Sequence, residues 1–164
     1  MRFRKFRLKI ALDSHRWGAR MKVEDLIRSR SEVYSITEVM TVYDAARYLR
    51  EKQVRSVGVI KPDGKLVGVV SQADISDKVA AENKCPAWMR VSEVMTPNPI
   101  TVPPNTHLDE CVRLMEKHGI YHLPVVDENA TYRGMISAQD LLRVIASDEK
   151  ARADMLESFL FSGR

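Results

Sequence analysis

Two short motifs in this chain place a serine three residues before an aspartate: Ser71-Gln-Ala-Asp74 and Ser137-Ala-Gln-Asp140. This spacing is typical of a helix N-cap, in which the hydroxyl accepts a hydrogen bond from a backbone N–H and the acid turns back toward the capping residue. Thr41-Val-Tyr-Asp44 and Thr106-His-Leu-Asp109 have the same spacing. Helix capping alone is therefore sufficient to explain the pattern.

The two serine motifs differ from the threonine motifs in what precedes them. Each serine ends an apolar run that begins near a glycine, Gly68 or Gly134, and leads directly into a helical pattern. A strand that runs into a helix places unpaired N–H groups and the positive end of the helix dipole at one edge of the sheet, where anions bind. A carboxylate one turn into the helix can accept hydrogen bonds from a ribose diol. Phosphate near the serines and ribose near the aspartates would make a nucleotide site.

The elements that must position these motifs occur twice, at a constant shift of 66 residues. Each copy contains a strand, an amphipathic helix, two strands joined by a polar turn, and a second helix. The corresponding segments are 33–36, 42–49, 56–60, 66–71 and 75–79 in the first copy and 100–102, 108–115, 122–126, 132–137 and 141–145 in the second. The sequence therefore predicts an α+β fold of two βαββα repeats. Because each sheet would leave one face uncovered, we expect the repeats to pack through their sheets as a pseudo-twofold pair.

Four segments are predicted along the chain. Residues 1–20 form a basic leader, 21–84 the first repeat, 85–147 the second, and 148–164 an amphipathic helix that packs on the body or on a second subunit. The segment before the first strand is two residues longer in the first repeat than in the second, because its opening matches at a shift of 68.

The charge of the chain is unevenly distributed. The net charge is +4, but residues 1–20 carry +6 and the remainder −2, which argues against a nucleic-acid footprint on the folded body. The leader fits an organellar transit peptide, a flexible basic arm or an upstream extension ahead of a start at Met21, and we favour the last. No apolar run approaches the ~18 residues of a membrane span. The two cysteines indicate a reducing compartment, so the sequence predicts a cytoplasmic protein.

The segment 119–127, Gly-Ile-Tyr-His-Leu-Pro-Val-Val-Asp, followed by Gly-Met-Ile-Ser-Ala-Gln-Asp-Leu-Leu at 134–142, resembles the second half of a CBS domain, the domain named after cystathionine β-synthase. Residues 91–102 are similar to that family's first strand and its lead-in. The resemblance covers residue 22 to about residue 147. It implies a tandem CBS pair, or Bateman module: a disc with two clefts that hold AMP, ADP, ATP, an NAD-like ligand or S-adenosylmethionine, and that usually dimerises.

Carried over position by position, the resemblance implies a set of nucleotide-binding residues. First-strand residues would frame the base, second-strand residues would contact phosphate, the serines would lie by the phosphates, and the aspartates would take the ribose. The set is Ser35, Ile36, Arg55, Ser56, Ser71 and Asp74 in the first repeat and Thr101, Val102, Tyr121, His122, Pro124, Ser137 and Asp140 in the second.

The cations of this set are few. The first repeat keeps one arginine, Arg55, and has Gly58 where the second has Pro124; the second repeat offers Tyr121 and His122 instead of an arginine. Since few cations weaken a triphosphate site, the sequence favours AMP or ADP over ATP. It also predicts that the two clefts differ in affinity.

The sequence was also searched by residue type for a metal site and for catalytic motifs, and neither is predicted. His107, Cys111, His118 and His122 allow a zinc site to be drawn, but Cys111 falls on the apolar helix stripe, so we interpret it as a buried thiol and predict no metal. Hydrolase, zinc-protease and phosphate-loop motifs are absent, so no catalytic residue and no required cofactor is predicted. Two hypotheses remain: a non-catalytic nucleotide-sensing module, homodimeric and acting on an unidentified regulated protein, or a ligand-independent dimerisation scaffold.

Overall fold

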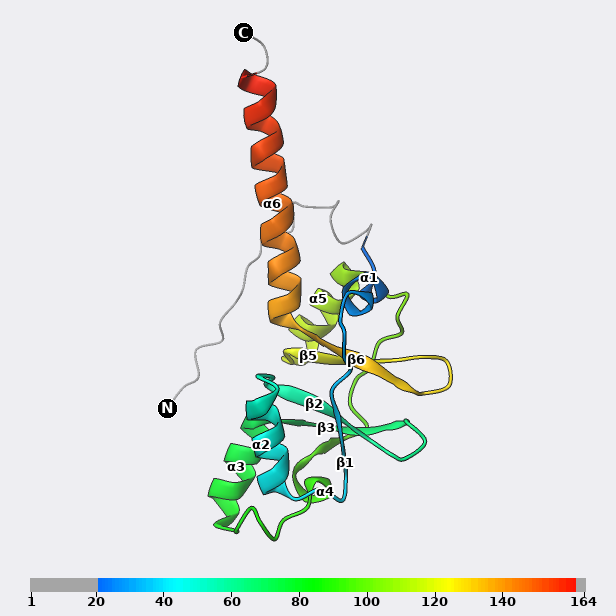
Figure 1. Ribbon diagram of the computed structural model, residues 1–164, viewed down its shortest axis with the longest axis vertical. Helices are drawn as coiled ribbons and strands as arrows, with labels where there is room; N and C mark the ends of the chain where they lie inside the picture. Colours follow the sequence, from blue (N-terminus) through cyan, green and yellow to red (C-terminus); the bar gives the residue numbers. More distant parts are fainter. Residues whose placement is uncertain (1–20, 162–164) are drawn as a thin grey trace.

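The computed structural model describes residues 21–161, with side chains through residue 150. The leader at 1–20 lies outside the described residues. Two groups of elements, each with a small sheet, lie one above the other (Figure 1). In chain order the elements are α1 (Val23–Arg28), β1 (Ser35–Thr37), α2 (Val42–Glu51), β2 (Ser56–Ile60), β3 (Leu66–Ser71), α3 (Gln72–Glu82), α4 (Val91–Val94), β4 (Thr96–Pro97), α5 (Leu108–His118), β5 (His122–Val126), β6 (Tyr132–Ser137) and α6 (Ala138–Phe161).

The first repeat builds a four-stranded sheet in the order β1-β2-β3-β4. β1 pairs in parallel with β2, whereas β2, β3 and β4 pair antiparallel. The amphipathic α2 buries Val42, Ala45 and Leu49 in the core of this repeat. β1 to α3 follow the predicted order, but the sequence did not predict β4, which comes from residues assigned to the second repeat.

The second repeat has a smaller sheet than predicted. β5 and β6 form a hairpin, and the strand expected at 100–102 is reduced to a single parallel bridge between Val102 and Val125. Pro103 and Pro104 follow directly, and because proline has no backbone N–H to donate, they end the ladder at this point. The residues of α5 that face the sheet, among them Leu108 and Cys111, are fully buried.

The two repeats exchange the segments that precede their first strands. α1 packs into the core of the second repeat, where Val23 is buried and its N–H donates to the Thr106 carbonyl over 2.9 Å. α4 packs into the core of the first repeat, where the Val91 N–H donates to the Met40 carbonyl over 2.9 Å. Each core is therefore completed by a segment that the sequence assigned to the other repeat.

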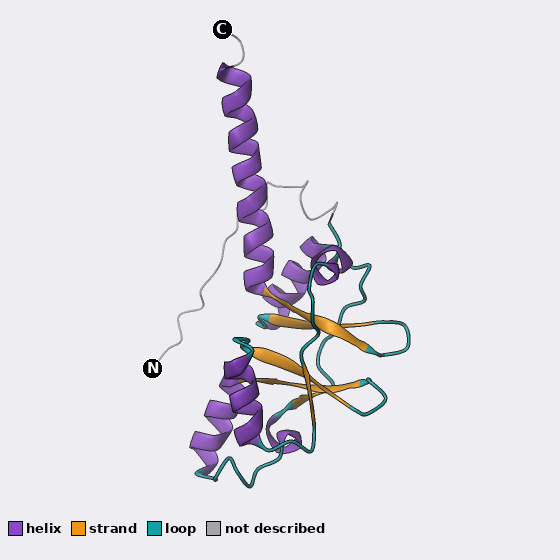
Figure 2. Cartoon of the chain, in the orientation of Figure 1, coloured by secondary structure: helices purple, strands orange, loops and turns teal. Residues whose placement is uncertain are grey.

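The repeats meet through their sheets, as Figure 2 shows. The Tyr132 ring on β6 lies against Gly58 on β2 and is only 7% exposed. At the hairpin turns, Lys65 and Thr131 form an antiparallel bridge, and the Tyr132 N–H donates to the Gly64 carbonyl over 3.0 Å. The predicted fold class, an α+β pair of repeats packed through their sheets, is confirmed.

The C-terminal segment differs from the prediction in its start. α6 runs without interruption from Ala138 to Phe161, so the helix expected from residue 148 continues the last helix of the second repeat. Figure 1 shows its C-terminal half rising away from both sheets. The side chains of residues 151–161 lie outside the described residues, so the packing expected for this segment, on the body or on a second subunit, stays a prediction. Within the described residues, no helix has both the length and the apolar character needed to cross a membrane.

Gly58→Ala is expected to destabilise the chain by about 1–3 kcal/mol, because an added methyl overpacks the contact between the sheets. A methyl carbon on Gly58 would lie 2.6 to 2.9 Å from three atoms of the Tyr132 ring. Urea unfolding of Gly58→Ala, Tyr132→Leu and the double variant measures the effect. The two losses should be less than additive, because the methyl meets the ring itself. Fully additive losses would contradict this account of the interface.

Candidate functional site

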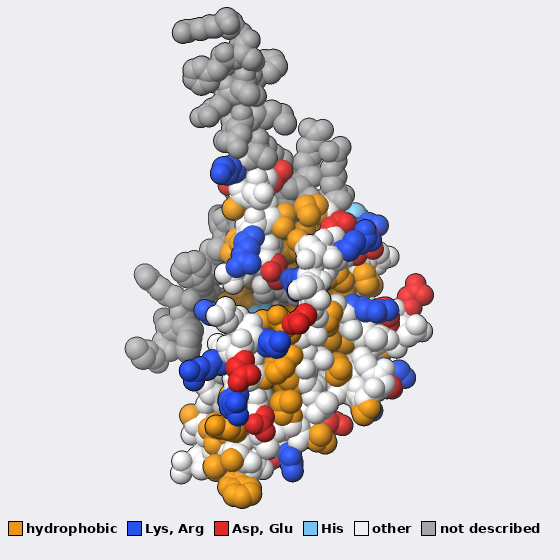
Figure 3. Space-filling model, viewed as in Figure 1, with side chains coloured by type: hydrophobic (Ala, Val, Ile, Leu, Met, Phe, Trp, Pro, Cys, Tyr) orange, Lys and Arg blue, Asp and Glu red, His pale blue; other side chains and the backbone are white. Residues whose placement is uncertain are grey.

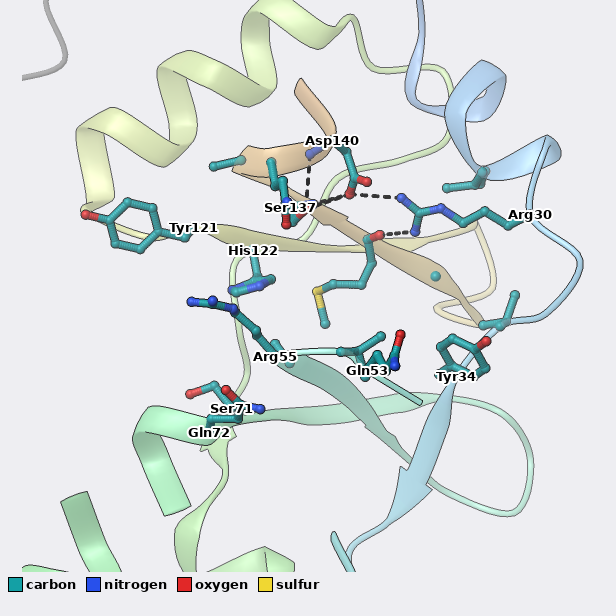
Figure 4. A pocket seen from close by; sticks show the side chains of 18 of the residues that line it. Arg30, Tyr34, Gln53, Arg55, Ser71, Gln72, Tyr121, His122, Ser137 and Asp140 are labelled. Carbon is teal, nitrogen blue, oxygen red and sulfur yellow. Dashed lines mark hydrogen bonds and ion pairs between the residues drawn. The ribbon is translucent and has the colours of Figure 1, made fainter. Parts of the chain in front are cut away.

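A cleft of about 890 Å³ opens between the two repeats. Its walls come from the α1–β1 connection, the starts of β2 and β5, the exposed edge of β6, and the first residues of α3 and α6. Figure 4 shows Ser137 and Asp140 on one side, Ser71 and Gln72 on the other, with Arg55 and other side chains between them. Both serine motifs thus contribute to the lining of the same cleft.

The N-termini of α3 and α6 both open on this cleft, and each carries the predicted capping box. Ser71 donates through its hydroxyl to Asp74 Oδ2 over 2.6 Å, and the Asp74 N–H donates back to the hydroxyl over 3.1 Å. The Ser137 hydroxyl donates to Asp140 Oδ2 over 2.7 Å, and the Asp140 N–H donates to that hydroxyl over 3.2 Å. The capping interpretation of both motifs is confirmed, and the two caps have nearly identical geometry.

Asp140 differs from Asp74 in a further contact. Nη2 of Arg30 lies 3.0 Å from Asp140 Oδ2, and Nη1 of the same guanidinium donates to the Met135 carbonyl (Figure 4). The two side chains are 33% and 24% exposed, so this ion pair is partly buried. Arg30 therefore holds the second-repeat aspartate at the cleft wall, whereas Asp74 does not line the cleft.

Arg55 and His122 lie side by side in the middle of the cleft (Figure 4). Arg55 forms no ion pair with any residue that the structure describes, so its guanidinium is available to an anion. Burial lowers the pKa of His122 below its ordinary value, Arg55 lowers it further, and Asp140 opposes the shift. His122 is therefore neutral at pH 7, and Arg55 is the cation at the centre of the cleft.

The structure brings together about half of the residues predicted for nucleotide binding. Those that line the cleft are Arg55, Ser56, Ser71, Tyr121, His122, Ser137 and Asp140. Those that do not are Ser35, Ile36, Asp74, Thr101, Val102 and Pro124. Ile36 and Val102 are each only 2% exposed, because they complete the two cores. Pro124 is buried on β5, where its carbonyl accepts the Val102 N–H over 3.0 Å.

Sequence reasoning missed other residues that line the cleft. Arg30, Tyr34 and Gln53 come from the first repeat, and Arg143 comes from the second turn of α6. Arg143 lies three residues after Asp140, so a helical reading of the motif would have placed it on the same face. Arg30 carries no such signal, because it reaches Asp140 only through the exchange of α1 between repeats.

The zinc interpretation has no support in the placement of the residues. Cys111 is fully buried among apolar side chains, and burial raises the pKa of its thiol to about 11. Among the residues that the structure describes, no three His, Cys, Asp or Glu side chains are grouped as metal ligands. The buried-thiol interpretation of Cys111 is confirmed.

Figure 3 shows basic and acidic side chains interspersed over the visible face of the repeats.

Curated relatives match this chain over most of its own length but over only part of theirs. A homoserine O-acetyltransferase of Methanohalobium evestigatum is 30% identical over 80% of this chain and 24% of its own. An uncharacterised protein of Methanopyrus kandleri is 29% identical over 71% of this chain and 59% of its own. The chain thus spans about a quarter of one relative and three fifths of the other, and the enzymatic name describes the longer protein.

Solved structures match over nearly their own full length and over about three quarters of this chain. A protein with CBS domains from Burkholderia ambifaria has a TM-score of 0.72 and 30% identity, covering 78% of this chain and 96% of its own. The CBS domain pair of protein MJ0100, solved with 5′-methylthioadenosine and S-adenosyl-L-methionine, has a TM-score of 0.70 and 26% identity, covering 78% and 98%. CBSX2 in complex with AMP has a TM-score of 0.66 and 27% identity, covering the same shares.

The family model of the CBS domain matches this chain twice, at residues 23–81 and 91–147. The two matches coincide with the two repeats, each with the segment that precedes it. This chain therefore belongs to the CBS domain family and is a tandem CBS pair.

Proposed function

We propose that this chain is a regulatory module that binds an adenosine nucleotide, AMP or ADP, between its two CBS domains and catalyses no reaction. The observation that carries the proposal is the convergence of two helix N-termini, Arg55 and Asp140 on one cleft. Solved CBS pairs with which this chain shares its fold hold AMP, 5′-methylthioadenosine or S-adenosyl-L-methionine, which supports an adenosine ligand. Homodimerisation, a cytoplasmic location and an unidentified regulated protein belong to the same proposal.

The phosphate end of the ligand is assigned to Arg55 and the helix N-termini. In each helix the first N–H bonds to a carbonyl, that of Arg55 or Tyr121, and the third bonds to the capping serine. The second N–H groups, those of Ala73 and Gln139, have no acceptor within the described residues. One N–H at each positive dipole end and one guanidinium between them suit a small anion.

The ribose end is assigned to Asp140. Its interactions with Ser137 and Arg30 converge on Oδ2. A diol that bonds to this carboxylate must share it with Arg30 or displace Arg30 from it. Because the cleft is lined by both domains, a bound nucleotide would favour one arrangement of the pair, as a regulatory ligand must.

A short phosphate chain fits the charges of the cleft. Of its four arginines, Arg30 pairs with Asp140, and Arg133 pairs with Asp127 over 2.8 Å. Arg55 and Arg143 form no ion pair with described residues. Glu32 also lines the cleft, where it pairs with Lys52 over 3.4 Å. Two available guanidinium groups favour one or two phosphates over three.

The proposed absence of catalysis follows from how the polar groups of the cleft are used. A serine nucleophile needs a base that accepts its hydroxyl proton. The Ser71 and Ser137 hydroxyls instead donate to the carboxylates of their own capping boxes. His122 is opposite Ser137 in the β5–β6 register, yet the serine proton is held by Asp140.

The same capping boxes favour a second candidate, a ligand-independent dimerisation scaffold. Both aspartates are satisfied as caps without any ligand. In this reading the serine motifs serve helix stability alone, and the long α6 provides the contact surface. A binding measurement separates the two functions.

Arg55→Ala should weaken AMP and ADP binding about tenfold or more, because a hydrogen bond to a charged group contributes about 1.5–3 kcal/mol. Isothermal titration calorimetry of the full chain, with ATP, NAD and S-adenosylmethionine in parallel, measures the effect. Arg47→Ala is the matched control, since Arg47 lies on the exposed face of α2 and pairs with Glu51 outside the cleft. Equal losses in the two variants would contradict the assignment of Arg55. No heat with any of the five ligands would favour the scaffold.

Acid should destabilise the unliganded chain more than its His122→Gln variant. The folded pKa of His122 lies below the ordinary 6.5, so the unfolded chain binds more protons there. The stability contributed by the neutral ring is therefore full at high pH and is lost as pH falls through about 6.5. Urea midpoints at pH 7.5 and 5.5 measure the difference between the two proteins. Saturating AMP should reduce it, because a phosphate favours the protonated ring. An identical acid response of both proteins would contradict the burial of His122.

A further inference from the structure

The open cleft has a counterpart in the first domain. The 66-residue shift maps Gly134, Ser137 and Asp140 onto Gly68, Ser71 and Asp74. Just as the cleft lies along the outer edge of β6, the counterpart lies along the outer edge of β3, beside Asp74. We call it the first-domain position. The two capping boxes match, so any difference between the two places arises in what covers these edges.

At the first-domain position, β4 covers the edge. Thr96 pairs with Val69, and Pro97 pairs with Gly68, in an antiparallel ladder. Counted back from the first strands at the 66-residue shift, the residue equivalent to Thr96 is Arg30, which makes no such backbone pairing within the described residues. Arg30 reaches the β6 edge through its side chain, which bonds to the Met135 carbonyl. The edge of β3 is closed by main chain, whereas the edge of β6 remains part of the cleft lining.

The sequence explains this difference. The segment 96–99 reads Thr-Pro-Asn-Pro, and Pro97 disfavours helical backbone at Thr96 and keeps it extended, before the chain turns at Asn98 with a φ of 47°. An edge strand tolerates proline, because the missing N–H would face outward. The equivalent segment 30–33, Arg-Ser-Glu-Val, has no proline and forms no strand. Extended backbone therefore lies against β3 but not against β6.

The side chain before β4 fills the remaining space. A methyl carbon built on Gly68 would lie only 2.6 Å from the Met95 sulfur and 3.1 Å from the Thr96 carbonyl oxygen. On the open side, a methyl carbon on Gly134 would meet its nearest neighbour, Ile27, at 3.7 Å. The glycine of the first domain thus accommodates Met95 and leaves its neighbourhood occupied.

The charged side chains also favour an anion in the cleft over an anion at the first-domain position. None of the four arginines that line the cleft has a basic equivalent in the other domain, and Arg133 corresponds to Val67. Arg30, Arg55 and Arg143 correspond to Thr96, Tyr121 and Asp77. An anion at the first-domain position would meet a carboxylate where the cleft has a guanidinium.

We propose that each chain binds one adenosine ligand, in the cleft at Asp140, and that the first-domain position at Asp74 is closed by β4 and Met95. This inference rests on the proposed function, because it assigns the stoichiometry and the aspartate of that same site. Asp74 is then a helix cap and nothing more, although the sequence motif in which it lies is the twin of the Asp140 motif.

The test counts sites and compares two matched variants. Equilibrium dialysis of the full chain with AMP, and in parallel with ADP, S-adenosylmethionine and 5′-methylthioadenosine, gives the number of ligands per chain. Asp74→Asn and Asp140→Asn alter caps of the same geometry, so each controls for the structural effect of the other. Circular dichroism and urea midpoints confirm that the two variants fold alike.

The expected result is one ligand per chain, at least a tenfold loss of affinity in Asp140→Asn, and affinity within twofold of wild type in Asp74→Asn. Two ligands per chain, or a loss in Asp74→Asn as large as in Asp140→Asn, would overturn the single-site inference and leave the proposed function intact. Absence of binding by all four ligands to the wild-type chain would overturn both.

Discussion

The packing of β2 against β6 is the contact on which the rest of this structure depends. The Tyr132 ring lies on Gly58, where no side chain larger than hydrogen fits without a shift. This close approach places Arg55, the residue directly before β2, in the same cleft as Ser137 and Asp140 of the second domain. It also withdraws His122 from water, which lowers the pKa of that ring. The cleft is thus a property of the pair and of neither domain alone.

The exchange of α1 and α4 determines what borders each sheet. α1 completes the second core, so the chain that follows it passes along β6 and carries Arg30 to Asp140. α4 completes the first core, so the chain that follows it runs along β3 and pairs there as β4. The exchange is reciprocal, but the two connections differ in sequence. The Thr96–Pro97 strand and Met95 close one edge, whereas the Arg30 side chain leaves the other edge as part of the cleft lining.

The residues that were predictable are those anchored in a repeated local motif. Ser71, Ser137 and their aspartates were found because capping depends on neighbours three residues apart. Arg55 and His122 were implied by the family resemblance, which places phosphate contacts at the second strand of each repeat. Arg30 could not be found in this way, since its contact with Asp140 spans 110 positions and depends on which core α1 joins. The same reason hid β4, whose partner strand lies in the other domain.

The sequence by itself determined the two repeats, their order of strands and helices, both helix caps, and the α+β class, because each follows from periodicity and spacing within some tens of residues. Only the tertiary structure decided that both serine motifs line a shared cleft, that Ile36 and Val102 belong to the cores, that Pro124 is buried on β5, and that β4 covers the edge of β3. The physical reason is that a local pattern specifies which face of an element is apolar. Which other element buries that face is settled by packing across the whole chain, and here the packing exchanges segments between two nearly equivalent partners.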